Sequence, residues 1–299
     1  MANPLSHIRR HPKICKQLIG LSLTQLEQLI SKAGALNKKK QQETENQKIR
    51  VNSQGAGRPR SLARDEEICL TLFYLRQMPI FEVLGMMFEV SKTTANDVFH
   101  YWLPILQELL PSSLLEEWKK AIDDDEFCQE LLTSYQLLVD SFEQPRERPE
   151  DDDEQKKFFS GKKRQHTFKN QVISLPEGED IVDVVVGERG PEADVNLLRK
   201  QQKKMSENQT FEGDKAYQGA DRTKTPHKKP PKKELTEAQK EKNKEIAKER
   251  IYVEHLIRII KIFRIASERF RLKSSRYQQV ILVICGLVRL RIGAFKFSF

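Results

Sequence analysis

Residues 244–255 read Lys244-Glu-Ile-Ala-Lys-Glu-Arg-Ile-Tyr-Val-Glu-His255 and stand at the centre of a pattern that extends to Phe270. Apolar residues recur there at the intervals of a helix with one buried face. Glu254 falls among them, where a carboxylate is costly to bury without a partner, and Arg250 lies one turn earlier, at the offset of a same-face ion pair. The stretch predicts a helix that carries this pair. If this stretch is considered alone, a surface ion pair on an amphipathic helix is enough to explain the pattern.

The composition favours a basic, folded protein. The chain has 299 residues, 38% hydrophobic and 32% charged, with a formal net charge of +9, so anionic partners such as nucleic acid are favoured. None of its six histidines has the spacing of a zinc site. The apolar run Val280–Leu287 is too short to cross a bilayer, so we expect a cytoplasmic protein without a membrane partner. The cysteines show no CxxC spacing and are expected to be reduced core thiols; they are Cys15, Cys69, Cys128 and Cys285.

The N-terminal third is predicted to be helical. The apolar pattern of residues 14–36 predicts one or two short helices. Residues 37–60 are almost entirely polar or charged and end in Gly-Ala-Gly-Arg-Pro-Arg, so they cannot form a core. A solvated linker and a charged arm lying along a phosphate backbone are both compatible with this composition.

Residues 61–110 carry the pattern of a helix-turn-helix. Helices are expected at 62–76 and 80–88, and a third begins after Ser91, with the turn at 89–91. Small polar residues at the start of the third helix have the size and chemistry to reach base edges or phosphates. A generic three-helix bundle is the alternative. We expect the helix to continue over 103–120. The candidate DNA-contacting residues are Lys92, Thr93, Thr94 and Asn96.

A β-rich region follows. Strands are predicted at 135–140, 164–175 and 181–186, as three neighbours in one sheet, with a charged loop at 145–154 between the first two. A helix at 193–204, a strand at 210–214 and the long C-terminal helix come next. This order is that of a ribonuclease H-like sheet. The expected fold is therefore of the α+β or α/β class: an all-helical N-terminal helix-turn-helix region, then a ribonuclease H-like mixed-sheet catalytic domain.

Three carboxylates occupy related places in that order. Asp140 ends the first strand, Asp214 ends a later strand, and Glu254 lies on the following helix. Carboxylates from a central strand, its neighbour and a packed helix can converge on hard Mg²⁺ or Mn²⁺. Two such ions would activate a water or a 3′-hydroxyl for phosphodiester chemistry. Singly, each Asp suits a cap or turn, and Asp140 could instead form a loop pair with Glu143.

Five segments carry a resemblance: Leu138-Val-Asp140, Phe159-Ser-Gly-Lys-Lys-Arg-Gln-His-Thr167, Gly213-Asp-Lys-Ala-Tyr-Gln-Gly219, Leu235-Thr-Glu-Ala-Gln-Lys-Glu-Lys-Asn243 and Arg250-Ile-Tyr-Val-Glu-His255. With the helix-turn-helix region, they resemble bacterial insertion-sequence transposases of the DDE superfamily endonuclease type. The resemblance implies a catalytic and metal-binding triad of Asp140, Asp214 and Glu254, and transposon-end DNA as substrate. It further implies supporting roles for Lys215, Tyr217 and Arg250, and places Lys163 and His166 near bound DNA.

The predicted division of labour follows from this resemblance. Residues 1–120 would recognise the terminal inverted repeats, and residues 130–292 would cleave the transposon end and use its 3′-hydroxyl to attack target DNA. Because two DNA ends must be held together, we expect a homodimer or a larger synaptic complex. The alternatives are a non-catalytic DNA-binding relic or regulator of the same family, and a nuclease that does not transfer strands.

Overall fold

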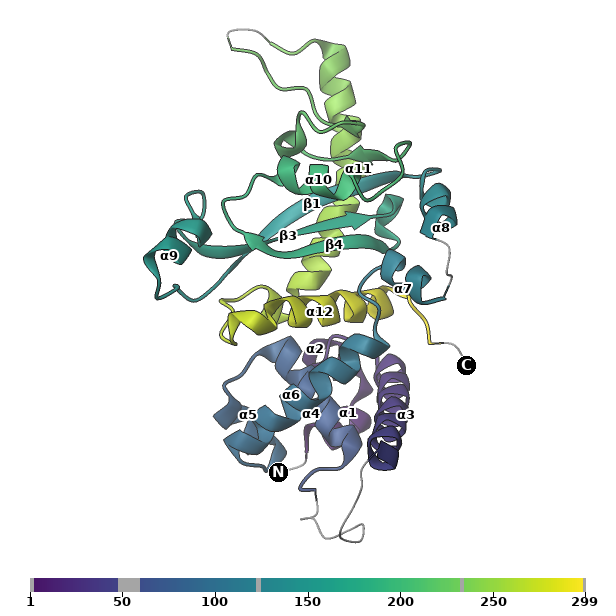
Figure 1. Cartoon of the computed structure of the whole chain (residues 1–299), viewed down its shortest axis with the longest axis vertical. Coiled ribbons are helices and arrows are strands. Elements are labelled where there is room, and N and C mark those ends of the chain that lie inside the picture. Colours follow the sequence, from purple (N-terminus) through teal and green to yellow (C-terminus); the bar gives the residue numbers. More distant parts are fainter. Residues whose placement is uncertain (1–2, 48–59, 122–124, 232–233, 298–299) are drawn as a thin grey trace. The chain divides into compact units, whose positions relative to one another are not determined.

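The computed structural model describes residues 3–47, 60–121, 125–231 and 234–297 (Figure 1). The chain forms two compact units. One comprises the described residues of Met1–Leu110 with the short segments Phe263–Ile265 and Phe295–Phe299. The other comprises the described residues of Pro111–Ile262 and Ala266–Ala294. Among the described helices, none is long and apolar enough to cross a membrane.

The first unit is entirely helical in its described residues. Its helices are α1 (Pro4–Arg10), η1 (Pro12–Ile14), α2 (Cys15–Leu18), α3 (Leu23–Gln47), α4 (Arg64–Gln77), α5 (Phe81–Phe88) and α6 (Lys92–Leu109). Nine consecutive residues of α4 are buried, so this helix is the centre of the unit. The buried Glu67 carboxylate accepts from Trp102 Nε1 at 2.8 Å and pairs with Arg60 Nη1 at 2.8 Å. The charge buried within the core is therefore hydrogen-bonded and paired.

The predicted linker is wrong over residues 37–47, which continue helix α3. Asn37 is buried, and its Oδ1 accepts from the Tyr101 hydroxyl at 2.6 Å. Gln41 donates to the same hydroxyl at 3.1 Å. These contacts to α6 hold a polar sequence in helical form, although its composition alone cannot supply a core. The rest of the predicted linker, 48–59, lies outside the described residues.

The three helices predicted over residues 61–110 are confirmed. Ser91 caps α6, because its hydroxyl accepts from the Thr94 backbone N–H at 3.1 Å. Glu89 turns the chain in the left-handed region, with φ 57°. A Cβ on Gly85 would lie 2.6 Å from the Val90 carbonyl oxygen, so the tight turn between α5 and α6 requires glycine there.

The second unit is built on a six-stranded mixed sheet. Its strands are β1 (Gln136–Pro145), β2 (Phe159–Ser160), β3 (Gln165–Ser174), β4 (Ile181–Arg189), β5 (Thr210–Glu212) and β6 (Thr223–Lys224). Its helices are α7 (Leu114–Ala121), α8 (Asp125–Leu132), α9 (Asp152–Phe158), η2 (Pro176–Gly178), α10 (Asp194–Gln202), η3 (Lys215–Tyr217), α11 (Glu237–Lys261), η5 (Ser274–Arg276) and α12 (Tyr277–Ile292), and η4 (Arg264–Ala266) follows α11 at the boundary of the units. The strands β1, β3 and β4 are neighbours in one sheet, as predicted, and β3 pairs antiparallel with both others. Strand β5 pairs in parallel with β1, and β6 pairs in parallel with β5.

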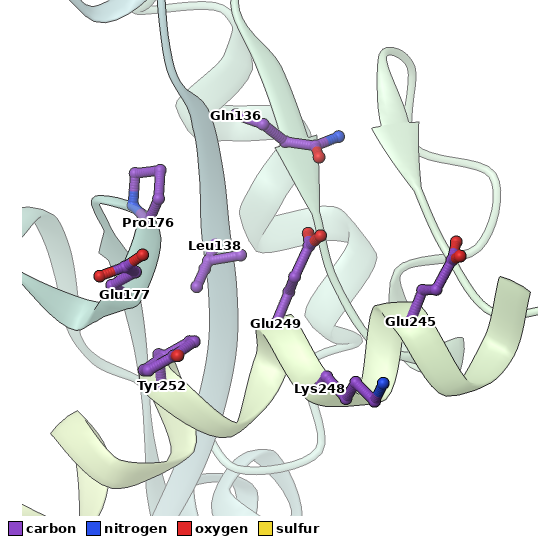
Figure 2. Close-up of a pocket in the computed structure, with 8 residues that line it drawn as sticks. All are labelled: Gln136, Leu138, Pro176, Glu177, Glu245, Lys248, Glu249 and Tyr252. Carbon is purple, nitrogen blue, oxygen red and sulfur yellow. The ribbon is translucent and has the colours of Figure 1, made fainter.

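Alternation along β1 assigns each side chain to a face of the sheet. Leu137 and Val139 pack with Leu198 of α10 in one apolar cluster. Leu138 instead faces Tyr252 of α11, which crosses the strands (Figures 1 and 2). Asp140 is two residues after Leu138 and therefore lies on the α11 face. Because the two residues share a face of the sheet, the Asp140 carboxylate lies on the side of β1 that α11 covers.

Several boundaries differ from the predictions; for instance, β5 ends at Glu212, two residues before Asp214. The helix expected over 103–120 is broken by Pro111 into α6 and α7. Strand β1 continues past Asp140 to Pro145, because it pairs with β3 along its whole second half, so Asp140 lies in mid-strand. The charged loop predicted at 145–154 includes the start of α9, capped by Asp151. The long helix α11 ends at Lys261 rather than near Phe270, and α12 was not predicted.

Candidate active site

Asp140 is placed on β1 with a partly buried carboxylate. Its Oδ1 accepts from the Ser141 backbone N–H at 2.8 Å. The pKa of Asp140 is raised to about 6, mainly by burial and also by the neighbouring charges of Asp214 and Glu254, against the opposing effects of this hydrogen bond and Arg250. The three predicted carboxylates therefore interact electrostatically, although they come from three separate elements.

Asp214 follows β5, the parallel neighbour of β1. Its Oδ1 accepts from the Ala216 backbone N–H at 2.7 Å and so caps the short helix η3. The preceding residue must be small: a Cβ on Gly213 would lie 2.7 Å from the Tyr217 ring and 3.0 Å from Val139. Tight packing against β1 thus fixes where the second carboxylate leaves the sheet.

Glu254 forms the predicted ion pair with Arg250, at 3.0 Å between Oε1 and Nη2. Glu254 is nevertheless the more exposed partner, although it falls among apolar positions in the sequence. Its side chain is 52% exposed, whereas the Arg250 side chain is 16% exposed, because Glu254 lies at the margin of the apolar stripe of α11. The arginine therefore reaches into the site, and Glu254 remains accessible to a ligand.

Tyr217 is buried and supports the strand beside Asp140. Its hydroxyl lies 2.6 Å from Ser141 Oγ and accepts from Gln171 at 3.4 Å. Burial raises the pKa of Tyr217 well above its usual value, so the hydroxyl stays protonated. Lys215, predicted as a further supporting residue, is exposed on η3. Of these two neighbours of Asp214, Tyr217 is the one in contact with β1.

The donor chemistry of the three carboxylates fits a hard divalent cation. In the contacts described, each uses one oxygen, accepting from Ser141, Ala216 or Arg250, and its second oxygen makes no protein hydrogen bond. A cation would also offset the unfavourable burial of the Asp140 charge. No three His, Cys, Asp or Glu side chains in the described part of the chain are already close enough together to hold one ion.

A basic cavity of about 150 Å³ borders this site. It is lined by Ser141, Phe142, Glu143, Lys162, Lys163, Lys169, Asp194 and Lys261. Lys169 pairs with Asp194 at 3.0 Å. Burial, and then the charge of Lys163, lower the pKa of Lys261. Lys163 lies in the turn just before β3, and His166 lies in β3, within the strand predicted over 164–175.

Glu143 does not form the alternative loop pair with Asp140. It lies within β1, and its Oε2 accepts from the Thr167 hydroxyl at 2.7 Å. Because strand side chains alternate, Glu143 and Asp140 lie on opposite faces of the sheet. Asp140 is therefore left available to Asp214 and Glu254.

A second cavity, of about 470 Å³, lies farther toward the N-terminus of α11 (Figure 2). Glu177, Glu245 and Glu249 line it, with Lys248 as a single cation among its lining residues. Glu249 also lies 3.9 Å from Lys224, which pairs at 2.7 Å with the fully buried Glu212. This cavity repels phosphate, in contrast to the basic cavity beside Ser141.

The helix-turn-helix residues lie at the start of α6. Lys92 and Thr93 are exposed, and Lys92 pairs with Glu82 of α5 at 2.5 Å. Thr94 lies 2.9 Å from the Ser91 hydroxyl, and Asn96 is partly buried. Lys92 and Thr93 are therefore better placed to contact DNA than Thr94, whose side chain takes part in the helix cap.

Sequence reasoning missed the residues that complete the site. Lys261 follows Glu254 by seven residues, two helical turns on the same face of α11, and this spacing could have indicated it. Ser141 and Lys169 carry no such signal, because their roles depend on strand pairing. The pair of the buried Glu212 with the partly exposed Lys224 depends on the register of two short parallel strands.

Comparisons with known proteins give matches in both the helical and the sheet region. The model of the family described as "DDE superfamily endonuclease" matches residues 139–289, and that of "Helix-turn-helix of DDE superfamily endonuclease" matches residues 60–112. A curated relative, the "Probable transposase for insertion sequence element IS702" of Microchaete diplosiphon, is 29% identical over 236 residues, which cover 77% of this chain and 82% of the relative. No solved structure gives a significant match.

Proposed function

Since this chain belongs to the DDE superfamily endonucleases, we propose that it is the transposase of an insertion sequence that cuts DNA at the ends of its element and joins the freed 3′-hydroxyl to target DNA. The observation that carries this proposal is that Asp214 and Glu254, from two other elements, both lie close enough to Asp140 to raise the pKa of its partly buried carboxyl. Such convergence of like charges is typical of a site that binds cations.

We propose a ribonuclease H-like fold for residues 130–292, which make up most of the sheet unit. Its antiparallel strands β4, β3 and β1, followed by parallel β5 and β6, support this assignment. The three carboxylates lie on the central strand, after its neighbour and on a packed helix, which is the distribution expected for that fold.

Asp140, Asp214 and Glu254 would hold two Mg²⁺ or Mn²⁺ ions. When bound, such ions activate the attacking water or 3′-hydroxyl and neutralise charge on the phosphate. Arg250 orients Glu254 through their ion pair, and Tyr217 holds Ser141 and with it the backbone beside Asp140. Both reactions are displacements at phosphorus, so one set of residues serves cleavage and transfer by positioning and charge neutralisation.

The helical unit, within residues 1–120, would recognise the terminal inverted repeats. Lys92 and Thr93 at the start of α6 would meet DNA first, with Thr94 and Asn96 behind them. Lys163 and His166 would lie along the DNA strand held at the catalytic site. Holding two ends together requires a homodimer or a larger synaptic complex.

The test is a gel assay with Mg²⁺ on a labelled duplex that carries the element's own ends. Wild type should cleave, and Glu254→Gln should bind the ends but not cleave. Glu241→Gln is the matched control, because Glu241 is an exposed carboxylate on the same helix whose one described ion pair is a long surface contact of 3.8 Å with Lys244. End binding without cleavage by wild type would replace the proposal with a non-catalytic regulator, and full activity of Glu254→Gln would refute the triad.

A further inference from the structure

Two consecutive aromatic residues between α9 and β3 have opposite surroundings. The Phe158 ring meets the Phe168 ring edge-on, with centroids 5.6 Å apart, and the Arg146 guanidinium lies 4.2 Å from it. Phe159 is 45% exposed, and its described ring contact is an edge-on approach to His166 at 5.5 Å. Phe158 is thus part of the packing of the unit, whereas Phe159 presents most of its ring to solvent.

Phe159 stands at the base of a basic hairpin. It pairs with His166 across strands β2 and β3, and residues 161–164 form the turn between them (α9 and β3 are labelled in Figure 1). Lys162, Lys163 and Arg164 in this turn are exposed, and in the described part of the chain none of them forms an ion pair. Exposed aromatic rings among unpaired cations are the composition of sites that bind single-stranded nucleic acid.

The same hairpin borders the proposed catalytic site. Lys162 and Lys163 line the basic cavity together with Lys261 of α11, whose charge interacts with those of both Lys163 and Asp140. A strand whose phosphate reaches Asp140 therefore passes within reach of this turn. Two of the three acidic residues of α9, Asp153 and Glu154, pair with Lys156 and Lys157 on their own helix, at 3.4 Å and 3.1 Å.

We propose that Phe159, backed by His166, is a stacking platform for an unpaired nucleobase of the DNA strand held at Asp140, Asp214 and Glu254. The ligand class is a single-stranded or frayed DNA end, whose phosphates the lysines of the turn attract. Burial and the charges of Arg148 and Arg146 lower the pKa of His166, so its ring is neutral at neutral pH and supports Phe159 through an edge-on contact. This inference rests on the proposed function.

The probe is a short duplex with a single-stranded tail that contains one 2-aminopurine, compared with the same duplex without a tail. Stacking on an aromatic ring is worth 1–3 kcal/mol per base, so Phe159→Ala should weaken binding of the tailed duplex by about 5- to 150-fold. It should also remove the fluorescence change of 2-aminopurine, while binding of the blunt duplex is unchanged. Phe159→Trp should keep the wild-type affinity for the tailed duplex and the fluorescence change, whereas Phe159→Leu should lose both, as Phe159→Ala does.

Phe127→Ala is the matched control, since Phe127 is a 50% exposed phenylalanine on α8, away from the hairpin. Unaltered thermal unfolding of Phe159→Ala is expected because the ring is exposed. The inference is overturned if Phe159→Ala binds the tailed duplex and changes its fluorescence as wild type does. Cleavage of intact element ends by wild type, measured in parallel, would in that case leave the proposed function standing.

Discussion

Arg289 is the side chain whose loss should destabilise the sheet unit most. It lies on α12 with none of its surface exposed. Its Nε and Nη2 donate to the two oxygens of Asp180 at 2.6 Å and 2.7 Å. Nη1 donates to the carbonyls of Pro111 and Ser113, both at 3.0 Å, and Nη2 also donates to Glu117 at 2.7 Å. All five guanidinium N–H groups are therefore used, and they tie three separate segments of the unit together.

Arg289→Met retains most of the apolar volume but removes every donor. Asp180, which is 6% exposed, would be left as an unpaired buried charge, and two buried carbonyls would lose a partner. Breaking a buried pair in this way costs about 3–5 kcal/mol. Glu117, whose side chain is 34% exposed, can be rehydrated and adds little. In a unit of this size, each kcal/mol lowers the melting temperature by roughly 2–4 °C, so a fall of about 6–20 °C is expected.

The assay is urea and thermal unfolding followed by circular dichroism, with hydrogen–deuterium exchange of α12 and β4 to locate the loss. Asp180→Asn should destabilise as well, and the double variant should lose less than the sum of the two singles, because the residues form one network. Lys120→Met is the control: its pair with Glu116, at 2.8 Å on the surface of α7, is worth about 0.5 kcal/mol. A loss below about 1 kcal/mol for Arg289→Met would refute the reasoning.

Two further predictions concern the proposed catalytic residues. The pKa of Asp140 is raised to about 6 from its usual 3.8, so the metal-free protein loses stability as the pH rises from 3.8 to 6. Above pH 6, Asp140→Asn should therefore be more stable than wild type, by at most about 3 kcal/mol. Melting curves recorded with a chelator should show this difference vanishing below pH 4. A difference that does not vary with pH would contradict this. Gly213→Ala should cost about 1–3 kcal/mol and reduce cleavage, since its Cβ would lie 2.7 Å from the Tyr217 ring. Gly34→Ala, with nothing within 4 Å of its Cβ, should be stabilising instead; equal effects of the two substitutions would disprove the packing account.

Local patterns were sufficient to predict the elements that carry the carboxylates. The apolar period of α11, the β-branched run of β4 and the cap at Ser91 are properties of a few neighbouring residues, and the structure confirms each of them. The order of these elements then placed Asp140, Asp214 and Glu254 on neighbouring parts of one unit. Chain order was informative because adjacent elements pair in space.

Features that depend on distant partners could not be predicted. The helical state of residues 37–47 depends on Tyr101, which lies more than fifty residues away. The exposure of Glu254 and the burial of Arg250 depend on how α11 is rotated about its axis against the sheet. A periodic apolar pattern shows which face of the helix is buried but does not decide the burial of residues at the margin of that face. Helix α12 is apolar nearly all round, so it shows little periodicity, and the burial of Arg289 within it depends on Asp180.

On the proposed function, the charge along α11 also gives the bound strand a direction. Glu245 and Glu249 line the acidic cavity, Glu254 follows at the triad, and Lys261 lines the basic cavity. At 1.5 Å per residue, Glu245 and Lys261 are separated by about 24 Å along the helix, several times the spacing of successive phosphates. A polyanion is repelled at the first end and attracted at the second, so a strand that reaches Glu254 is expected to leave past Lys261 and the turn of the hairpin rather than over the acidic cavity.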